Sequence, residues 1–134
     1  MFTNPTRAAQ LINFQGLKYG NCSPTDLDLT IEWKGLTFAF CELKLKGTPL
    51  TIGQRLYLSN TVNAINDGGR HAVALFAEHE VDDPSQDVIA AEAIVSLAYG
   101  KDKQWVNVKA QGWTLGEYLE KVYRHHLDRN NLSY

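Results

Sequence analysis

The stretch PTDLDLTIEWKGLTFAFCELKLKG, residues 24–47, alternates polar and apolar side chains on both sides of Lys34-Gly35. A period of two is typical of β-strands, and a lysine–glycine pair between two such runs indicates a turn. We therefore expect a hairpin with strands over residues 26–33 and 36–46. Both strands carry acidic side chains and the second also carries lysines, although charges within a sheet are costly unless something there uses them.

The length of the turn decides which charged side chains face one another. A strict two-residue turn pairs residues whose numbers sum to 69, and Asp28 then lies opposite Cys41. A three-residue loop, or a single bulge, raises the sum to 70 and places Asp28 opposite Glu42. Asp26 then lies opposite Lys44. If the acidic groups act together, the hairpin must therefore have the longer connection.

One kind of chemistry would use the carboxylates and the lysine of this hairpin together. Two carboxylates that lie a few ångströms apart repel each other, and a Mg²⁺ or Mn²⁺ ion between them relieves the repulsion. Glu42 and Lys44 are two residues apart on one strand, so their side chains point to the same face. A bound metal ion polarises a phosphate and activates a water, and a neighbouring lysine orients that water or stabilises developing charge. The pattern favours metal-assisted hydrolysis of a phosphoester.

The composition is that of an ordinary globular protein. Of its 134 residues 44% are hydrophobic and 21% are charged, which argues against disorder and is consistent with one domain over residues 1–134. Cys22 and Cys41 have no CxxC spacing, so neither a disulfide framework nor a zinc site is indicated. No apolar run is as long as a membrane span, and MFTNPTRAAQ lacks the apolar core of a signal peptide. We expect a cytoplasmic protein without a membrane partner.

The rest of the chain alternates helix and strand signals. An Asn-Pro pair and two S/T-x-x-E/Q capping boxes mark helix starts, and compact apolar runs mark strands. The order α-β-β-α-β, then a β-hairpin and a C-terminal helix, predicts an α/β fold with helices on both faces of a mixed sheet. The predicted elements outside the first hairpin are a helix over 4–16, a helix opened by Thr51 and Gln54 and closed by 67–69, a central strand over 71–80, a loop over 82–87, a hairpin of strands 93–99 and 105–108, and a helix opened by Thr114 and Glu117 that runs to about Asp128.

The charged residues and their setting resemble the PD-(D/E)XK nuclease superfamily, the fold of many restriction enzymes, archaeal Holliday-junction resolvases and VRR-NUC nucleases. PTDLD, FCELKLKG and a following helix that begins GQRLYL carry the resemblance, which covers residues 24–60. It implies a restriction-endonuclease-like sheet in which Asp28 and Glu42 bind the metal. It also implies that Lys44 serves the attacking water and that Gln54 completes the site.

Several assignments stay open at this point. The aspartate of the family's Pro-Asp pair corresponds here to Asp26 or Asp28; we favour Asp28, with Asp26 as a second ligand or a supporting group. Gln54 is a site residue, the third residue of a capping box, or both. Lys46 and Arg55 flank the site, either as ordinary solvated charges or as contacts to substrate phosphates. The four histidines show no metal-ligand spacing, so none is predicted to act.

The expected function is that of a Mg²⁺- or Mn²⁺-dependent deoxyribonuclease, structure-selective and of phage, repair or recombination type. A domain of this size has little room for its own DNA-recognition module, so a homodimer or a place in a larger DNA-processing assembly is expected. One alternative is a catalytically silent nuclease-fold domain that binds nucleic acid or protein, which the net charge of −2 slightly favours. Another is a metal-dependent enzyme that hydrolyses a different phosphoester, such as a nucleotide.

Overall fold

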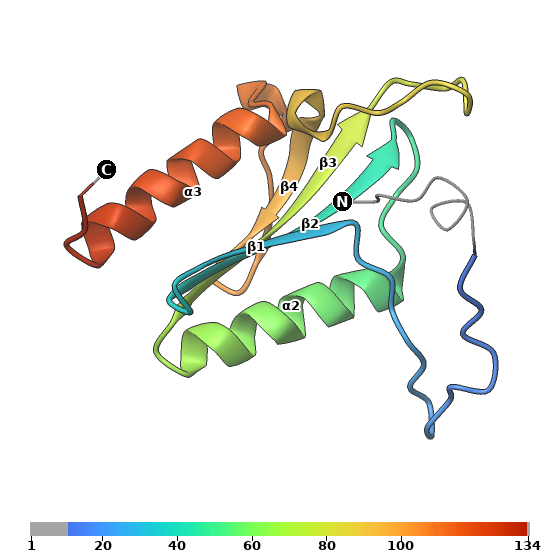
Figure 1. The fold of residues 1–134 in the computed structure, drawn as a ribbon, viewed down its shortest axis with the longest axis horizontal. Coiled ribbons are helices and arrows are strands. Elements are labelled where there is room, and N and C mark those ends of the chain that lie inside the picture. Colours follow the sequence, from blue (N-terminus) through green and yellow to red (C-terminus); the bar gives the residue numbers. More distant parts are fainter. Residues whose placement is uncertain (1–10, 134) are drawn as a thin grey trace.

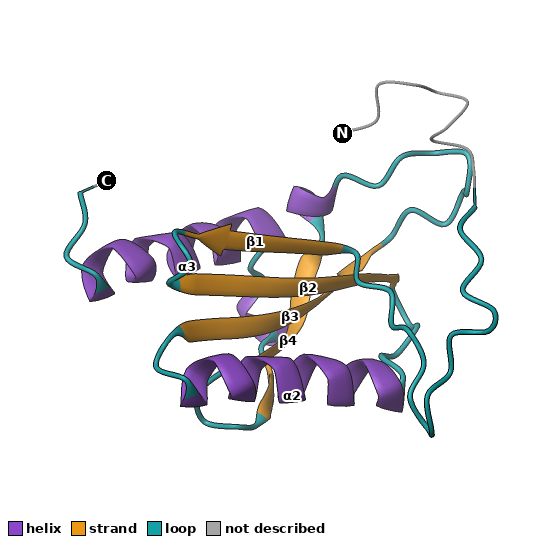
Figure 2. Cartoon of the chain, turned by 60° about the horizontal axis from the view of Figure 1, so that its bottom comes forward, coloured by secondary structure: helices purple, strands orange, loops and turns teal. Residues whose placement is uncertain are grey.

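The computed structural model describes residues 11–133 of the chain. Five strands form one mixed sheet in the order β1-β2-β3-β4-β5, and α2 and α3 cover its two faces, as predicted (Figure 1, Figure 2). β2 and β3 are parallel and joined through α2, whereas the other neighbouring strands are antiparallel. The elements are β1 (Leu29–Trp33), β2 (Thr37–Leu45), α2 (Ile52–Asp67), β3 (His71–His79), β4 (Ile94–Tyr99), β5 (Trp105–Asn107) and α3 (Leu115–Arg129), with single 3₁₀ turns at Ala90–Glu92 and Lys109–Gln111.

The first hairpin has the longer of the two possible connections. Trp33 pairs with Thr37 and Leu29 pairs with Cys41, so the paired numbers sum to 70. Lys34 and Gly35 both have positive φ angles, 55° and 66°, and the Leu36 N–H donates to the Trp33 carbonyl at 2.9 Å. The chain thus turns tightly and then adds one residue before pairing begins. The register that brings Asp28 to Glu42 is confirmed.

Both predicted capping boxes are present at the helix starts. The Thr51 hydroxyl accepts from the Gln54 N–H, and the Gln54 side chain accepts from the Thr51 N–H. Thr114 and Glu117 make the same reciprocal pair at the start of α3. Each box satisfies two backbone donors that a helix start leaves free, so both helices begin where the sequence predicts.

Two apolar clusters hold the helices against the sheet. Each is formed by alternate residues of the strands and by the inward residues of one helix, and burying a large aliphatic side chain contributes about 1.5–3 kcal/mol. Cys41 is fully buried, as its place in the alternation predicts, and burial raises the pKa of its thiol to about 12. The α3 cluster is Cys41, Leu75, Ala77, Ala93, Val95, Val108 and Leu115, and the α2 cluster is Leu50, Leu58, Val62, Ala72, Ala74, Phe76 and Tyr99.

Two predicted elements differ from the structure. Residues 4–10 of the expected first helix lie outside the described residues, and residues 11–14 are not helical. Leu11 and Ile12 are 96% and 80% exposed, so the apolar stripe of that helix has nothing to pack against, and short helices need such packing. β1 begins at Leu29 instead of residue 26, because the Asp28 carboxylate accepts the Leu43 N–H that a longer strand would have bonded.

Within residues 11–133, neither helix is long and apolar enough to cross a membrane.

Candidate active site

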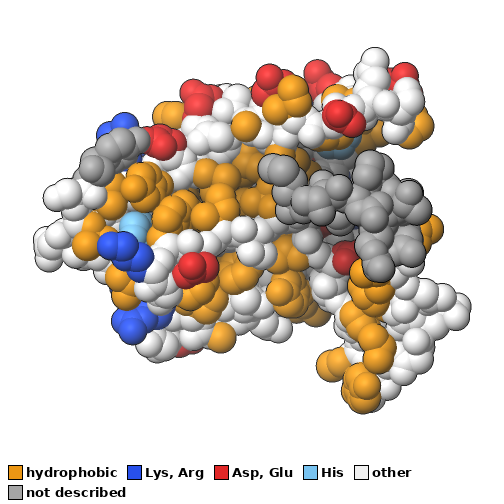
Figure 3. All heavy atoms as spheres, viewed as in Figure 1, with side chains coloured by type: hydrophobic (Ala, Val, Ile, Leu, Met, Phe, Trp, Pro, Cys, Tyr) orange, Lys and Arg blue, Asp and Glu red, His pale blue; other side chains and the backbone are white. Residues whose placement is uncertain are grey.

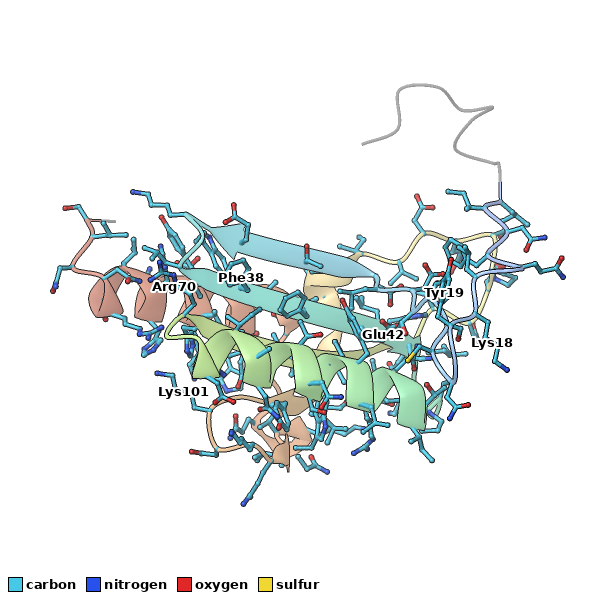
Figure 4. The ribbon with its side chains drawn as sticks, turned by 90° about the horizontal axis from the view of Figure 1, so that it is seen from below. Lys18, Tyr19, Phe38, Glu42, Arg70 and Lys101 are labelled. Carbon is cyan, nitrogen blue, oxygen red and sulfur yellow. The ribbon has the colours of Figure 1, made fainter. Side chains whose placement is uncertain are left out.

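Strand β2 holds two of the predicted site residues on the face that α2 covers. Glu42 lies beside Phe76 of the α2 cluster, and Lys44 lies beside Glu78 of the neighbouring strand. Figure 4 shows the Glu42 side chain between the sheet and α2. Glu42 is 6% exposed, whereas Asp28 is on the surface just before β1. A carboxyl group is therefore buried in an otherwise apolar layer.

Asp28 and Glu42 influence each other directly. The Asp28 Oδ2 atom accepts the Leu43 N–H at 2.7 Å, which holds this side chain against β2. Burial, the charge of Asp28 and a hydrogen bond between the two side chains raise the pKa of Glu42 to about 7. The charge of Lys44 and the Asp28 backbone N–H lower it in part. The two acids thus form the like-charge pair that the hairpin register predicts.

Gln54 belongs to the capping box and also contacts Glu42. Its Oε1 atom accepts the Thr51 N–H at 3.0 Å, so the capping box fixes which way its amide points. The Nε2 group is then left to donate to the Glu42 Oε1 atom, at 3.4 Å. The start of α2 therefore contacts the site through a long hydrogen bond, and Gln54 helps to orient the buried carboxyl group.

Lys44 is half-buried and shares the Glu42 face of β2. Its charge acts on the Glu42 carboxyl group, but across residues 11–133 it forms no ion pair. Lys46, by contrast, is paired with Glu80 at 3.0 Å. Among the described residues, the Lys44 ammonium is thus available to a bound group.

The remaining predicted site residues are Asp26, Lys46 and Arg55, and among the described residues none of them forms a hydrogen bond or an ion pair with Asp28 or Glu42. Asp26 is exposed and makes no hydrogen bond or ion pair with any described residue. Lys46 is paired with Glu80, and the Arg55 guanidinium lies 5.7 Å from the centre of the Trp105 ring. A metal role for Asp26 and phosphate contacts for Lys46 and Arg55 stay predictions.

Glu78 is a residue that the sequence analysis did not single out. Burial opposes its ionisation, but hydrogen bonds from Ser96, the Gly47 N–H and Lys109 lower the pKa of its carboxyl group on balance. Through these hydrogen bonds Glu78, on β3, links the segment after β2 to β4 and to the 3₁₀ turn after β5. An acid two residues before the end of the apolar run 71–80 was the signal for it. With its oxygens so occupied, Glu78 has a structural role beside Lys44.

Two neighbouring hollows lie near the end of β3, and Asp28 lines one of them whereas Glu42 lines neither. A cavity of about 310 Å³ is lined by Asp28, Leu43, His79 and Val88, among others, and a second of about 480 Å³ shares His79 and Val88 with it. The His79 Nδ1 atom accepts the Val81 N–H at 3.1 Å. The second hollow contains both acids and lysines, so its wall has no single sign of charge.

The acidic pair is suited to a magnesium-type ion. Among the described residues, no group of three or more His, Cys, Asp or Glu side chains is placed to hold a metal. Mg²⁺, however, is commonly bound through only one or two carboxylates and otherwise by water and substrate phosphate. Burial is the main cause of the raised pKa of Glu42, and a divalent cation beside Asp28 and Glu42 would offset the charge repulsion that adds to it. The residues present therefore fit the ion that the family resemblance implies.

A comparison of the chain with models of known families, with curated proteins and with solved structures finds no match.

Proposed function

We propose that this protein is a metal-dependent deoxyribonuclease of the PD-(D/E)XK type, with a restriction-endonuclease-like sheet. The observation that carries the proposal is the buried Glu42 carboxyl group held beside Asp28, with Lys44 unpaired on the same face. Keeping two acids together in this way opposes stability whenever both are ionised. Such a pair is favourable when a cation and a phosphate lie beside it, which is the composition of a nuclease centre.

Each side chain has a distinct part in the proposed reaction, which is hydrolysis of a phosphodiester by water. Asp28 and Glu42 would hold Mg²⁺ or Mn²⁺, an ion that supplies Lewis-acid polarisation and lowers the pKa of a bound water. Gln54 holds the Glu42 carboxylate in position through its Nε2 group. Lys44 orients the attacking water and stabilises the negative charge that develops on the phosphate. The leaving oxygen departs with a proton from solvent.

DNA is the proposed substrate, and contact with it is expected to be local. The net charge of −2 and the acidic segment that follows β3 do not favour a protein that coats nucleic acid. A few contacts around one site suit the recognition of a DNA shape, such as a flap or a junction, by a dimer or by a larger phage or repair assembly. Lys46 and Arg55 are the candidates for neighbouring phosphate contacts.

The experiment that tests the proposal is cleavage of labelled duplex, single-stranded, flap and four-way-junction DNA with Mg²⁺, Mn²⁺ or EDTA. We expect metal-dependent cutting that Lys44→Ala lowers by at least about 100-fold, because a positioned charge at the reacting phosphate is lost. Lys121→Ala is the matched control. Lys121 lies on α3, with its ammonium over the Trp113 ring, and this variant should cut like the parent. If no DNA is cut but mononucleotides are hydrolysed, the substrate class is wrong.

A catalytically silent domain of the same fold is the second candidate. It is favoured by one observation, namely that no third His, Cys, Asp or Glu side chain joins the two carboxylates as a metal ligand among the described residues. Such a domain would bind DNA without cutting it and would bind no divalent ion at Asp28 and Glu42. Absence of both cutting and metal binding would select this candidate.

A further inference from the structure

The opposite end of the sheet gathers basic side chains from three separate segments. His71 opens β3, Lys101 follows β4, and His125 and Arg129 come from the last turns of α3. Arg70 precedes His71 in the chain, and Figure 4 places Arg70 and Lys101 at the end of the sheet away from Glu42. Lys and Arg side chains also gather where α2 and α3 end in the space-filling view (Figure 3). We call Arg70, His71, Lys101, His125 and Arg129 the cationic end.

His71 is the buried member of the cationic end and lacks a partner. It is 9% exposed, and its Nδ1 atom is enclosed without a hydrogen bond to any described residue. The His125 ring lies 4.9 Å from its ring, centre to centre. Buried polar atoms are normally paired, so an enclosed imidazole nitrogen without a partner among residues 11–133 is a candidate contact for a bound ligand.

His126, the next residue along α3, shows what a structural histidine looks like in this protein. Its Nδ1 atom lies 2.7 Å from the Thr37 hydroxyl and 3.2 Å from the Asn130 amide nitrogen, and it stacks with Trp33. His126 is thus fully used in joining α3 to the sheet. Among the described residues, no comparable hydrogen bond holds the Nδ1 atom of His71.

The charges around His71 identify the kind of ligand that would fit. Burial, followed by the charges of His125, Lys101 and Arg129, lowers the pKa of His71 to about 4. Two of the three neighbouring groups, Lys101 and Arg129, are cationic, which opposes a metal ion although two imidazoles lie close together. Of the nearby acids, Asp67 is paired with Lys103 at 3.4 Å, and Asp102 and Asp128 are exposed. A negatively charged ligand would relieve the crowding of positive charge.

The ends of the helices explain only part of the cluster. Cations are favourable near helix C-termini, and Arg129 lies in the last turn of α3 with its Nη2 atom 3.5 Å from the Gly69 carbonyl. Lys101 belongs to neither helix, and in the described chain neither it nor Arg70 forms an ion pair. Among the described residues, Lys101 and Arg70 are therefore available to a bound anion.

We propose that the cationic end binds a phosphate group between Lys101, Arg129, His125 and His71. The two flexible cations supply the charge, and the imidazoles supply N–H donors to the phosphate oxygens. The exposed His125 ring turns aside to let the anion reach the His71 Nδ1 atom. Thr37, the neighbour of His71, precedes Glu42 by five residues on β2, so this site lies about 17 Å from the acidic pair. The proposal does not depend on nuclease activity.

The test is NMR of the histidine ring protons at pH 7, with sodium phosphate added against sodium chloride of equal ionic strength. The rings of His71 and His125, assigned through His71→Gln and His125→Gln, should shift and saturate with phosphate. His79 is the internal control, because it lies at the other end of the same strand and should not move. The variant with both Lys101→Ala and Arg129→Ala should bind phosphate at least about tenfold more weakly, whereas Lys121→Ala should bind as the parent.

The outcomes separate the two sources of such a phosphate. Tighter binding of a 5′-phosphorylated oligonucleotide than of the unphosphorylated one and of inorganic phosphate would identify a nucleic-acid end as the ligand. Binding of inorganic phosphate with no gain from the oligonucleotide would identify a free phosphate or a small phosphoester. If His71 and His79 shift alike in phosphate and chloride, without saturation, the cationic end has no phosphate site and the proposal is wrong.

Discussion

The two ends of strands β2 and β3 show the same arrangement with opposite charge. At one end Asp28 crowds the buried Glu42, and at the other His125, Lys101 and Arg129 crowd the buried His71. In each case one ionisable side chain is enclosed among groups of its own sign, and its pKa moves toward the neutral form. Between them lies an apolar sheet held by two helices. This arrangement is the basis of the two proposals, a divalent cation at the acids and a phosphate at the bases.

The largest expected difference between the two ends is the sign of their pH dependence. The folded-state pKa of Glu42 is raised to about 7, from 4.5, so the native state binds more protons than the unfolded state between these values. The contribution of Glu42 to the free energy of unfolding is therefore lost as the pH rises from about 4.5 to about 7. Urea unfolding should show Glu42→Gln near the parent at pH 4.5 and roughly 3 kcal/mol more stable at pH 8 without metal. A constant difference between these pH values would contradict the burial of an ionised Glu42.

His71 should show the reverse dependence. Its folded-state pKa is lowered to about 4, from 6.5, so stability is present above pH 6.5 and is lost as the pH falls toward 4. Relative to the parent, His71→Gln should therefore gain roughly 3 kcal/mol between pH 7.5 and pH 4. The same urea series measures it, and His79→Gln serves as the control from the other end of β3. Equal behaviour of the two variants would show that the cationic end does not act on His71.

A smaller effect is expected from the turn that sets the register of the acidic pair. Gly35 has a φ of 66°, where a Cβ atom is unfavourable, although an added Cβ would meet no other atom. Gly35→Ala should therefore cost about 1–2 kcal/mol of unfolding free energy. Gly100→Ala is the matched control, because that glycine lies in open space and has no positive φ. A cost at Gly100 equal to that at Gly35 would show that the turn conformation is not the cause.

The elements that could be predicted from the sequence are those with local signals. The capping boxes at Thr51 and Thr114 lie next to the helices they start. The alternation along a single strand places the Glu42 and Lys44 side chains on the same face. The longer hairpin connection could be deduced only as a condition for the acids to meet. The structure meets that condition with a tight turn and one extra residue.

The parts that could not be predicted depend on contacts between distant residues. Of the expected helix at 4–16, the described residues 11–14 are not helical, because Leu11 and Ile12 find no surface to cover and tertiary packing outweighs propensity. His71 and His125 are unremarkable in the sequence, since neither has a partner at ligand spacing. Only the docking of α3 on the sheet brings their rings together. The role of Glu78 likewise depends on Gly47, Ser96 and Lys109, which lie on three other segments.

The measurement that tests the central claim most directly is calorimetry of Mn²⁺ binding at pH 8 to the parent, Asp26→Asn, Asp28→Asn and Glu42→Gln. The raised pKa of Glu42 makes this pH suitable, because its carboxyl group is then ionised. We expect the parent and Asp26→Asn to bind one ion, and Asp28→Asn and Glu42→Gln to bind at least about tenfold more weakly. Equal binding by Asp28→Asn and Asp26→Asn would contradict the choice of Asp28. No binding by the parent would mean that the buried acidic pair is not a metal site.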